Sequence, residues 1–166
     1  NSLVSIGITA FNARDTIERA ALSALGQTWR PVEIIVVDDC SSDATPAILE
    51  MLSRHHPEIR VIRHDENRGV AAARNSIIKA ARGEFVVFFD DDDESRTDRV
   101  SLQVQRIVDY EHNNPVATGL VICHSARRVT YPDGSVRVEP TMGERCSRSA
   151  PAGRAVAERI LFGTPL

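Results

Sequence analysis

The sequence predicts an α/β fold in which a mostly parallel sheet is flanked by helices. Two patterns carry this prediction. Short apolar runs alternate with longer stretches in which apolar residues recur at helical spacing. The run at 85–89 contains no polar residue at all, which is typical of a strand covered on both faces inside a parallel sheet. The repeated strand–helix order therefore indicates a Rossmann-like arrangement with helices on both faces.

Four strand–helix units are expected in order. Asn12 is the expected N-cap of the first helix, residues 41–43 cap the second, and Pro57 and Pro115 end the second and the fourth. Right-handed crossovers would place the carboxyl ends of all four strands on one edge of the sheet. The strands are expected at 3–9, 32–37, 59–63 and 85–89, and the helices at 12–25, between 43 and 57, at 70–81 and at 97–110.

The pattern changes after Pro115. Residues 116–131 are β-rich, and the turn signal at 132–135 followed by a short apolar return predicts a β-hairpin excursion. Residues 142–152 are polar and predict a loop. A short helix is expected at 155–162, with Val156, Ile160 and Leu161 facing inward.

Composition sets the outer limits. The 166 residues suggest a single domain, and the 42% of hydrophobic residues is enough for a core. The net charge of −3 gives no basic surface for nucleic acid, and no apolar run is long enough to span a membrane. The first residues enter a strand pattern rather than a signal peptide. Three cysteines without CxxC spacing favour a reducing compartment, so we expect a cytoplasmic location.

The fourth strand runs directly into five carboxylates, Asp90–Glu94, called the acidic run below. Ligands of open α/β sheets collect just outside the carboxyl ends of the strands. Crowded acids repel one another and raise one another's pKa values unless a positive partner joins them. Hard oxygen ligands suit Mg²⁺ or Mn²⁺, and such an ion is usually shared with substrate phosphates. The alternative is a solvated acidic loop that contains a helix cap.

Other polar and aromatic residues reach the same edge. Phe11 can stack on a base, Asp39 can accept a hydrogen bond from a ring N–H, and Arg74 can pair bidentately with base or phosphate oxygens. Together with a cation these groups suit a nucleoside diphosphate. Each also has a structural alternative: a hydrophobic staple for Phe11, a residue before a helix cap for Asp39, and a salt bridge for Arg74. His55, His56, His64 and His112 are expected at the surface.

Two common phosphate motifs are missing. No GxxxxGK[ST] is present, so the acidic run is not part of a P-loop ATPase. No GxGxxG follows the first strand, which disfavours a nicotinamide cofactor.

Four motifs, in this order and spacing, resemble glycosyltransferase family 2 and cover about the first 100 residues. They are residues 4–12 (VSIGITAFN), 33–43 (EIIVVDDCSSD), 67–75 (NRGVAAARN), and ARGE at 81–84 with the acidic strand end at 89–93 (FDDDD). The resemblance implies a glycosyltransferase A fold and an inverting transfer of a sugar from a nucleoside-diphosphate sugar to an acceptor hydroxyl. Uracil is the favoured base, and surface polysaccharide or glycoconjugate synthesis is the expected setting.

The resemblance also implies site roles. Asp92 is the expected direct metal ligand for Mn²⁺ or Mg²⁺, and Asp90 or Asp91 is expected towards the ribose. The residues implied to bind the nucleotide-sugar are Thr9, Phe11, Asn12, Asp39, Arg74, Asp90 and Asp91.

In this family the carboxylate base lies in the later, acceptor half, often in a Glu-Asp pair, and after the acidic run the sequence offers only isolated acids. We therefore expect residues 1–166 to be a truncated catalytic domain. Residues 1–110 would form the nucleotide-sugar-binding half and 111–166 the start of the acceptor half, with the base beyond Leu166. The acceptor is expected to be a saccharide or a lipid-linked molecule, and the full protein could associate peripherally with a membrane.

Two alternatives stay open. A non-catalytic nucleotide-sugar-binding module is compatible with the missing base. A sugar nucleotidyltransferase would need a glycine-rich loop after the first strand, whereas residues 10–14 contain no glycine.

Overall fold

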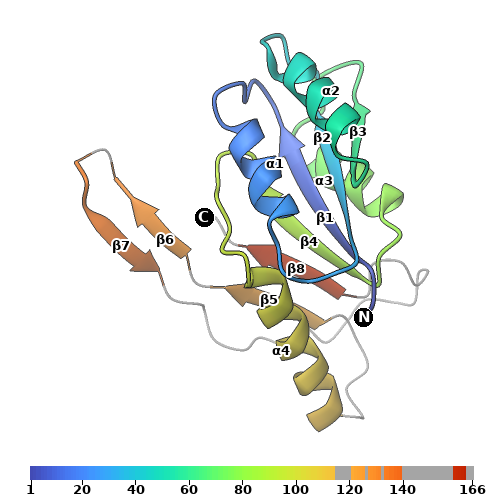
Figure 1. Ribbon diagram of the computed structural model, residues 1–166, viewed down its shortest axis with the longest axis vertical. Helices are drawn as coiled ribbons and strands as arrows, with labels where there is room; N and C mark the ends of the chain where they lie inside the picture. Colours follow the sequence, from blue (N-terminus) through green and yellow to red (C-terminus); the bar gives the residue numbers. More distant parts are fainter. Residues whose placement is uncertain (115–120, 126, 132, 140–158, 164–166) are drawn as a thin grey trace.

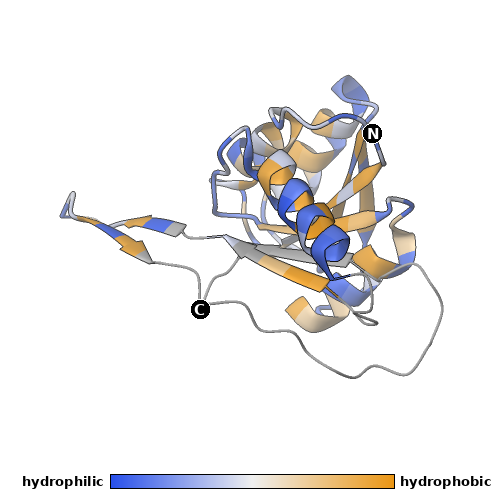
Figure 2. Ribbon diagram, turned by 90° about the horizontal axis from the view of Figure 1, so that it is seen from below, coloured by the Kyte–Doolittle hydropathy of each residue, from blue (hydrophilic) through white to orange (hydrophobic). Residues whose placement is uncertain are grey.

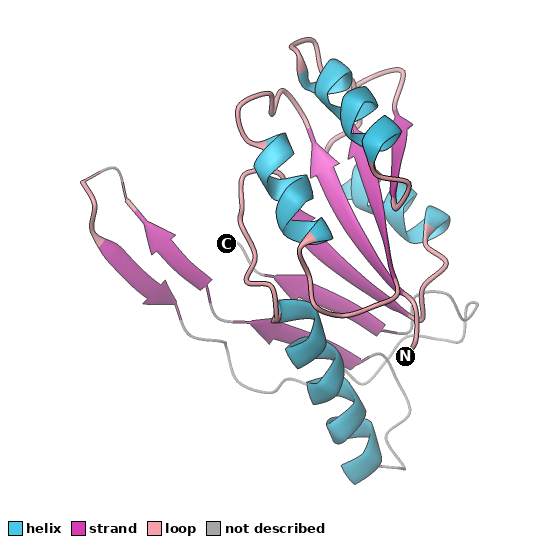
Figure 3. Ribbon diagram, viewed as in Figure 1, coloured by secondary structure: helices cyan, strands magenta, loops and turns pink. Residues whose placement is uncertain are grey.

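The computed structural model describes residues 1–114, 121–125, 127–131, 133–139 and 159–163 (Figure 1). The first part of the chain alternates strand and helix, as the sequence predicts (Figure 3). Its elements are β1 (Val4–Ala10), α1 (Ile17–Leu25), β2 (Val32–Asp38), α2 (Thr45–His55), β3 (Ile59–Arg63), α3 (Val70–Ala80), β4 (Phe85–Asp90) and α4 (Arg99–Asn113).

The described strands form a six-stranded sheet in the order β3-β2-β1-β4-β8-β5, and every pair within it is parallel. β1 lies inside the sheet, with Ile6 opposite Ile34 of β2 and opposite Val87 of β4. The chain builds outward from β1 to β3 and then returns to the other side of β1. The strand order therefore reverses between β1 and β4, which is where sheets of this type bind ligands.

Each face of the sheet carries its own hydrophobic core. On one face α1, α2 and α4 cover residues such as Ile6, Val36 and Phe89. On the other face Ala73 and Ile77 of α3 pack against alternate residues of β2 and β4. Figure 2 shows the apolar residues concentrated in the strands. At Gly7 a Cβ would overlap the Ile77 side chain, so this glycine allows α3 to lie close to β1.

The C-terminal described segment corrects one prediction. Residues 159–163 form strand β8 (Arg159–Gly163) rather than the end of a helix. β8 pairs with β4 and with β5 (Val121–Ser125), where Ile160 lies opposite both Val86 and Ile122. A short apolar run suits either element, and the backbone hydrogen bonds offered by two flanking strands decide the outcome. Residues 155–158 of the predicted helix and the predicted loop at 142–152 lie outside the described residues.

The predicted hairpin is confirmed. β6 (Arg127–Thr130) and β7 (Val136–Glu139) pair antiparallel and extend away from the main sheet. The Tyr131 N–H donates to the Ser135 carbonyl, and Gly134 takes a φ of 81° in the connecting turn. Among the described residues, no helix is both long and apolar enough to cross a lipid bilayer.

The start of the first helix differs from the prediction. α1 begins at Ile17, with Thr16 at its N-cap, so assigning the N-cap to Asn12 was wrong. Asn12 has a φ of 51° in the preceding loop, where its Oδ1 accepts a hydrogen bond of 2.9 Å from the Ser42 N–H. Its own backbone N–H donates to Ser41 Oγ. Asn12 therefore joins the β1–α1 loop to the β2–α2 loop. Its partners there lie about 30 residues further along the chain, so a local helix signal could not reveal them.

Candidate active site

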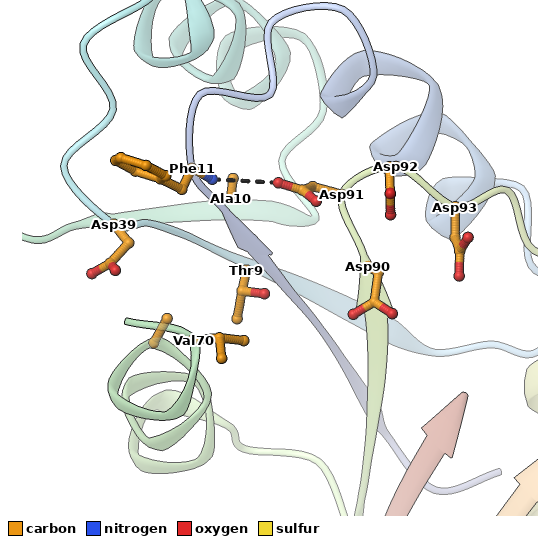
Figure 4. A pocket seen from close by; sticks show the side chains of 10 residues that line it. Thr9, Ala10, Phe11, Asp39, Val70, Asp90, Asp91, Asp92 and Asp93 are labelled. Carbon is orange, nitrogen blue, oxygen red and sulfur yellow. Dashed lines mark hydrogen bonds between the residues drawn. The ribbon is translucent and has the colours of Figure 1, made fainter. Parts of the chain in front are cut away.

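A cavity of about 450 Å³ lies at the carboxyl ends of β1, β2 and β4 (Figure 4). It sits at the point where the strand order reverses, as expected for a ligand site in an open α/β sheet. Its lining consists of Thr9, Ala10, Phe11, Asp39, Val70, Ala73 and Asp90–Asp93.

Asp39 follows β2 and is held by three donors. The Gly69 N–H donates to Oδ2 at 2.7 Å, and the Arg68 N–H lies within 3.1 Å of both carboxylate oxygens. His64 Nδ1 lies 2.6 Å from Oδ1. Burial opposes ionisation of this carboxyl, but the hydrogen bonds from Arg68, His64 and Gly69 outweigh it and lower the pKa of Asp39. The side chain is therefore an oriented, ionised acceptor at the cavity wall.

His64 corrects a third prediction. It was expected at the surface, yet it is only 7% exposed. Its ring lies between Asp39 and Ser76, whose Oγ is 2.9 Å from Nε2. A lone histidine after a strand resembles a surface residue, and its two partners come from other elements. The only sequence signal is that His64 directly follows β3 and Asp39 directly follows the neighbouring strand β2.

Apolar surface flanks Asp39. Phe11 is 49% exposed and Val70, at the start of α3, is 55% exposed. Figure 4 shows both side chains, together with Asp39, around the same part of the cavity. An aromatic and an aliphatic side chain beside an acceptor suit a flat heterocycle that carries an N–H.

The first four residues of the acidic run, Asp90–Asp93, form the opposite wall of the cavity (Figure 4). Burial raises the pKa of Asp90, and the charges of Asp93 and Asp92 raise it further, while Arg74 opposes the shift. Burial also raises the pKa of Asp91. There a hydrogen bond of 3.3 Å from the Phe11 N–H opposes the shift, and the charges of Asp92 and Asp90 add to it. These carboxylates are thus short of positive charge, in contrast to Asp39.

Two arginines approach the acidic run from inside the protein. Arg74 Nη2 lies 3.2 Å from Asp90 Oδ1, and its guanidinium stands 5.5 Å from the centre of the Phe88 ring. Arg99 donates to the Phe88 carbonyl at 2.9 Å and lies 4.3 Å from the centre of the Phe89 ring. Burial lowers the pKa of Arg99 to about 10, against the opposing charges of Asp90 and Asp93. It stays protonated at neutral pH and offsets part of the negative charge.

The segment after the acidic run is fixed to the C-terminal end of α1. Gln27 is buried, and its Nε2 donates to the Arg96 carbonyl at 2.8 Å while its Oε1 accepts from the Val100 N–H. The Thr28 N–H donates to the Thr97 carbonyl at 2.7 Å. The backbone of the acidic run is therefore anchored on both sides, by β4 before it and by these contacts after it.

The structure brings most of the expected site residues together. Thr9, Phe11, Asp39, Asp90, Asp91 and Asp92 all line the cavity. Arg74 lies next to it through its ion pair with Asp90. Asn12 is not among the lining residues, and its side chain is engaged with Ser42. Sequence reasoning missed His64 and Arg99. His64 contacts the lining residue Asp39, and the charge of Arg99 acts on the lining residues Asp90 and Asp93.

The donor set at the acidic run fits a divalent cation. Within the described residues, no group of three or more His, Cys, Asp or Glu side chains is arranged to hold a metal by itself. Mg²⁺ commonly takes one or two carboxylates and completes its shell with water and substrate phosphates. Asp92 and Asp93 are exposed beside the cavity, and the half-buried Asp90 and Asp91 next to them have raised pKa values, which matches that mode of binding.

The family model described as Glycosyl transferase family 2 matches residues 5–150. The chain belongs to this family. Succinoglycan biosynthesis protein ExoO of Rhizobium meliloti (strain 1021) is 46% identical over 103 residues, which cover 62% of this chain and 29% of that protein. Putative teichuronic acid biosynthesis glycosyltransferase TuaG of Bacillus subtilis (strain 168) is 40% identical over 103 residues, covering 62% and 41%.

Solved structures agree with this family assignment. TarS of S. aureus in complex with UDP superimposes with a TM-score of 0.61 at 28% identity, over 75% of this chain and 35% of that chain. Mannosyltransferase PcManGT from Pyrobaculum calidifontis, in complex with GDP-Man and Mn²⁺, gives a TM-score of 0.64 at 25% identity, over 76% and 36%. The expected glycosyltransferase A fold is thereby confirmed. The family 2 chain described here spans less than half the length of these four proteins.

Proposed function

We propose that this family 2 chain is the donor-binding part of an inverting, metal-dependent glycosyltransferase. It binds a nucleoside-diphosphate sugar, with UDP the favoured nucleotide, and serves the synthesis of a surface polysaccharide or glycoconjugate. One observation carries the proposal: the cavity at the strand reversal has an anchored acceptor and exposed apolar side chains at one end and crowded carboxylates at the other. That polarity matches a nucleoside joined to a diphosphate.

The roles of the residues follow from this orientation. Phe11 stacks on the base, Asp39 accepts its ring N–H, and Thr9 lies beneath the nucleoside at the end of β1. Asp90 and Asp91 face the ribose, and Asp92 is the direct ligand of the cation. Arg74, which pairs with Asp90 at 3.2 Å, exchanges this partner for a phosphate oxygen when the nucleotide binds. When bound, Mn²⁺ or Mg²⁺ supplies positive charge to the leaving diphosphate.

The transfer itself needs a group from the acceptor side. An acceptor hydroxyl attacks the anomeric carbon from the face opposite the diphosphate. A new C–O bond forms as the C–O bond to the phosphate breaks, and the configuration at the anomeric carbon inverts. The hydroxyl proton passes to a carboxylate base. Because the chain spans 29% of ExoO and 41% of TuaG, we propose that residues following this donor half supply that base.

The setting rests on the names of the relatives. ExoO and TuaG are named for succinoglycan and teichuronic acid biosynthesis, which favours a saccharide or lipid-linked acceptor for this protein. Peripheral membrane association and a cytoplasmic location stay predictions.

Calorimetry with UDP and GDP, each with and without Mn²⁺, tests donor binding. We expect one nucleotide to bind with an affinity that depends on the metal and to raise the melting temperature, because a ligand that binds only the native state stabilises it. The absence of binding by both nucleotides would contradict the proposal. A turnover assay on the complete protein then separates an enzyme from a non-catalytic module, since the module would bind donor without releasing a nucleoside diphosphate.

A further inference from the structure

We propose that His64 is a positioning residue that gives the site its selectivity for nucleobases carrying a ring N–H. It does so by holding the Asp39 carboxylate with one acceptor position turned to the cavity. The inference rests on the proposed function, because it assigns the base end of the cavity to Asp39.

The first step concerns the acceptor positions of Asp39. An ionised carboxylate offers about four of them. The N–H groups of Arg68 and Gly69 and the Nδ1 of His64 take up three, with the Arg68 N–H shared between both oxygens. Asp39 also lines the cavity. One acceptor position is therefore left for a ligand, and it favours a ring N–H over a ring nitrogen that carries only a lone pair.

The second step concerns the hydrogen-bond partners of the two ring nitrogens of His64. The carboxylate can only accept, so Nδ1 carries a hydrogen. In the neutral ring, Nε2 is then an acceptor for the hydroxyl of Ser76, which lies 2.9 Å away on α3. The His64 backbone N–H also donates to the Asp38 carbonyl at 2.9 Å, which fixes β3 beside β2. Ring and backbone are thus both held, and the imidazole has one orientation relative to Asp39.

The third step is what removal of His64 would do. Arg68 and Gly69 both belong to the loop before α3, so without His64 the carboxylate is held from one side only. It gains freedom to rotate, and a second acceptor position opens. Binding of any nucleotide could then continue through Phe11 and the acidic run, but the preference for an N–H would fall.

The experiment compares each nucleotide with its N-methylated counterpart. Calorimetry in the presence of Mn²⁺ gives the affinity of UDP against N3-methyl-UDP, and of GDP against N1-methyl-GDP. The readout is the ratio of the two affinities. We expect His64→Leu to reduce this ratio by about tenfold, the effect of one hydrogen bond to a charged group. His64→Asn places an N–H donor near the Nδ1 position and is expected to restore most of the ratio.

Two further variants keep the test decisive. Ser76→Ala removes only the outer bond to His64, and we expect it to lower the ratio by about threefold even if His64→Leu does not fold. His112→Leu, an exposed histidine on α4, is the matched control and should change nothing. The inference is overturned if His64→Leu and Ser76→Ala leave the ratio unchanged, or if the affinities for both members of a pair fall equally. Failure of the unaltered protein to bind UDP and GDP would instead overturn the proposed function.

Discussion

The two ends of the cavity use the same functional group in opposite ways. Asp39 receives hydrogen bonds from Arg68, Gly69 and His64, and these lower its pKa. Asp90 and Asp91 lie in the acidic run, where burial and the neighbouring carboxylates raise their pKa values. Both sets of carboxylates stand at the carboxyl ends of parallel strands, β2 and β4, which flank β1.

The difference shows how one sheet edge can bind two unlike parts of a ligand. At Asp39 the protein already supplies the donors, so the carboxylate is fixed and can orient a neutral base. At the acidic run, Arg74 and Arg99 offset only part of the charge, so a cation and its phosphates gain from binding there. Changing either end should therefore affect a different property of the same bound nucleotide.

The largest effect is expected for Asp92→Asn. This change removes the proposed direct ligand, and we expect the Mn²⁺-dependent affinity for UDP to fall by roughly 100-fold. The melting temperature without ligand should stay the same or rise slightly, because like-charge repulsion in the acidic run decreases. Glu94→Gln is the matched control, since Glu94 is exposed and is not among the residues lining the cavity. If calorimetry gave both variants the wild-type affinity, Asp92 would not be the direct ligand of the cation.

A smaller effect on binding, but a larger one on the fold, is expected for Asp39→Asn. The amide would direct an N–H at one of the three donors that now face the carboxylate. We expect a loss of about 1–3 kcal/mol in the free energy of unfolding, and an affinity for UDP about 30-fold lower. The enhancement of binding by Mn²⁺ should persist in this variant. If that enhancement disappeared, the two ends of the cavity would not be independent.

Phe11→Ala should weaken binding without destabilising the protein. The side chain is 49% exposed, so its loss removes only part of a buried side chain. Loss of stacking on a base costs about 1–3 kcal/mol, and we expect a value near the lower end of that range, roughly tenfold in affinity. Leu22→Ala is a suitable control, because Leu22 is 46% exposed on α1 and does not line the cavity. Equal losses of UDP affinity in the two variants would argue against stacking.

The smallest effect separates the pH dependence of folding from that of binding. Glu33 resembles Asp39: burial opposes its ionisation, but hydrogen bonds from Ser5 and Arg82 prevail and lower its pKa. Its stabilisation is therefore complete above the ordinary glutamate range and is lost as the pH falls through the lowered pKa. Asp90 and Asp91 have raised pKa values, so their protonation favours folding while it opposes cation binding.

Glu33→Gln tests that distinction. At neutral pH we expect the variant to unfold with about 1 kcal/mol less free energy, and its loss of stability towards acidic pH to be shallower than in the wild type. Metal-dependent UDP binding should keep its wild-type pH profile. Glu33 is the second residue of β2, and the cavity lies at the other end of that strand. Denaturant unfolding and calorimetry across the same pH series check both points. An unchanged slope of stability against pH would contradict the role given to Glu33.

The sequence predicts the first four strand–helix units and the site residues on them because these signals are local. Uninterrupted apolar runs define the strands, and parallel crossovers bring Phe11, Asp39 and the acidic run to one edge. What it did not reveal depends on partners distant in the chain. His64 is buried through Asp39 and Ser76, and Asn12 is held by the loop after β2. β8 is a strand because β4 and β5 flank it.

The most direct test of the account is a titration of uridine and of UDP into the protein, each with and without Mn²⁺. Uridine carries the base and ribose but lacks the diphosphate. The account predicts that Mn²⁺ strengthens UDP binding by roughly 100-fold and leaves uridine binding unchanged, because the cation joins only the diphosphate to the acidic run. An equal effect of Mn²⁺ on both ligands, or none on either, would contradict it.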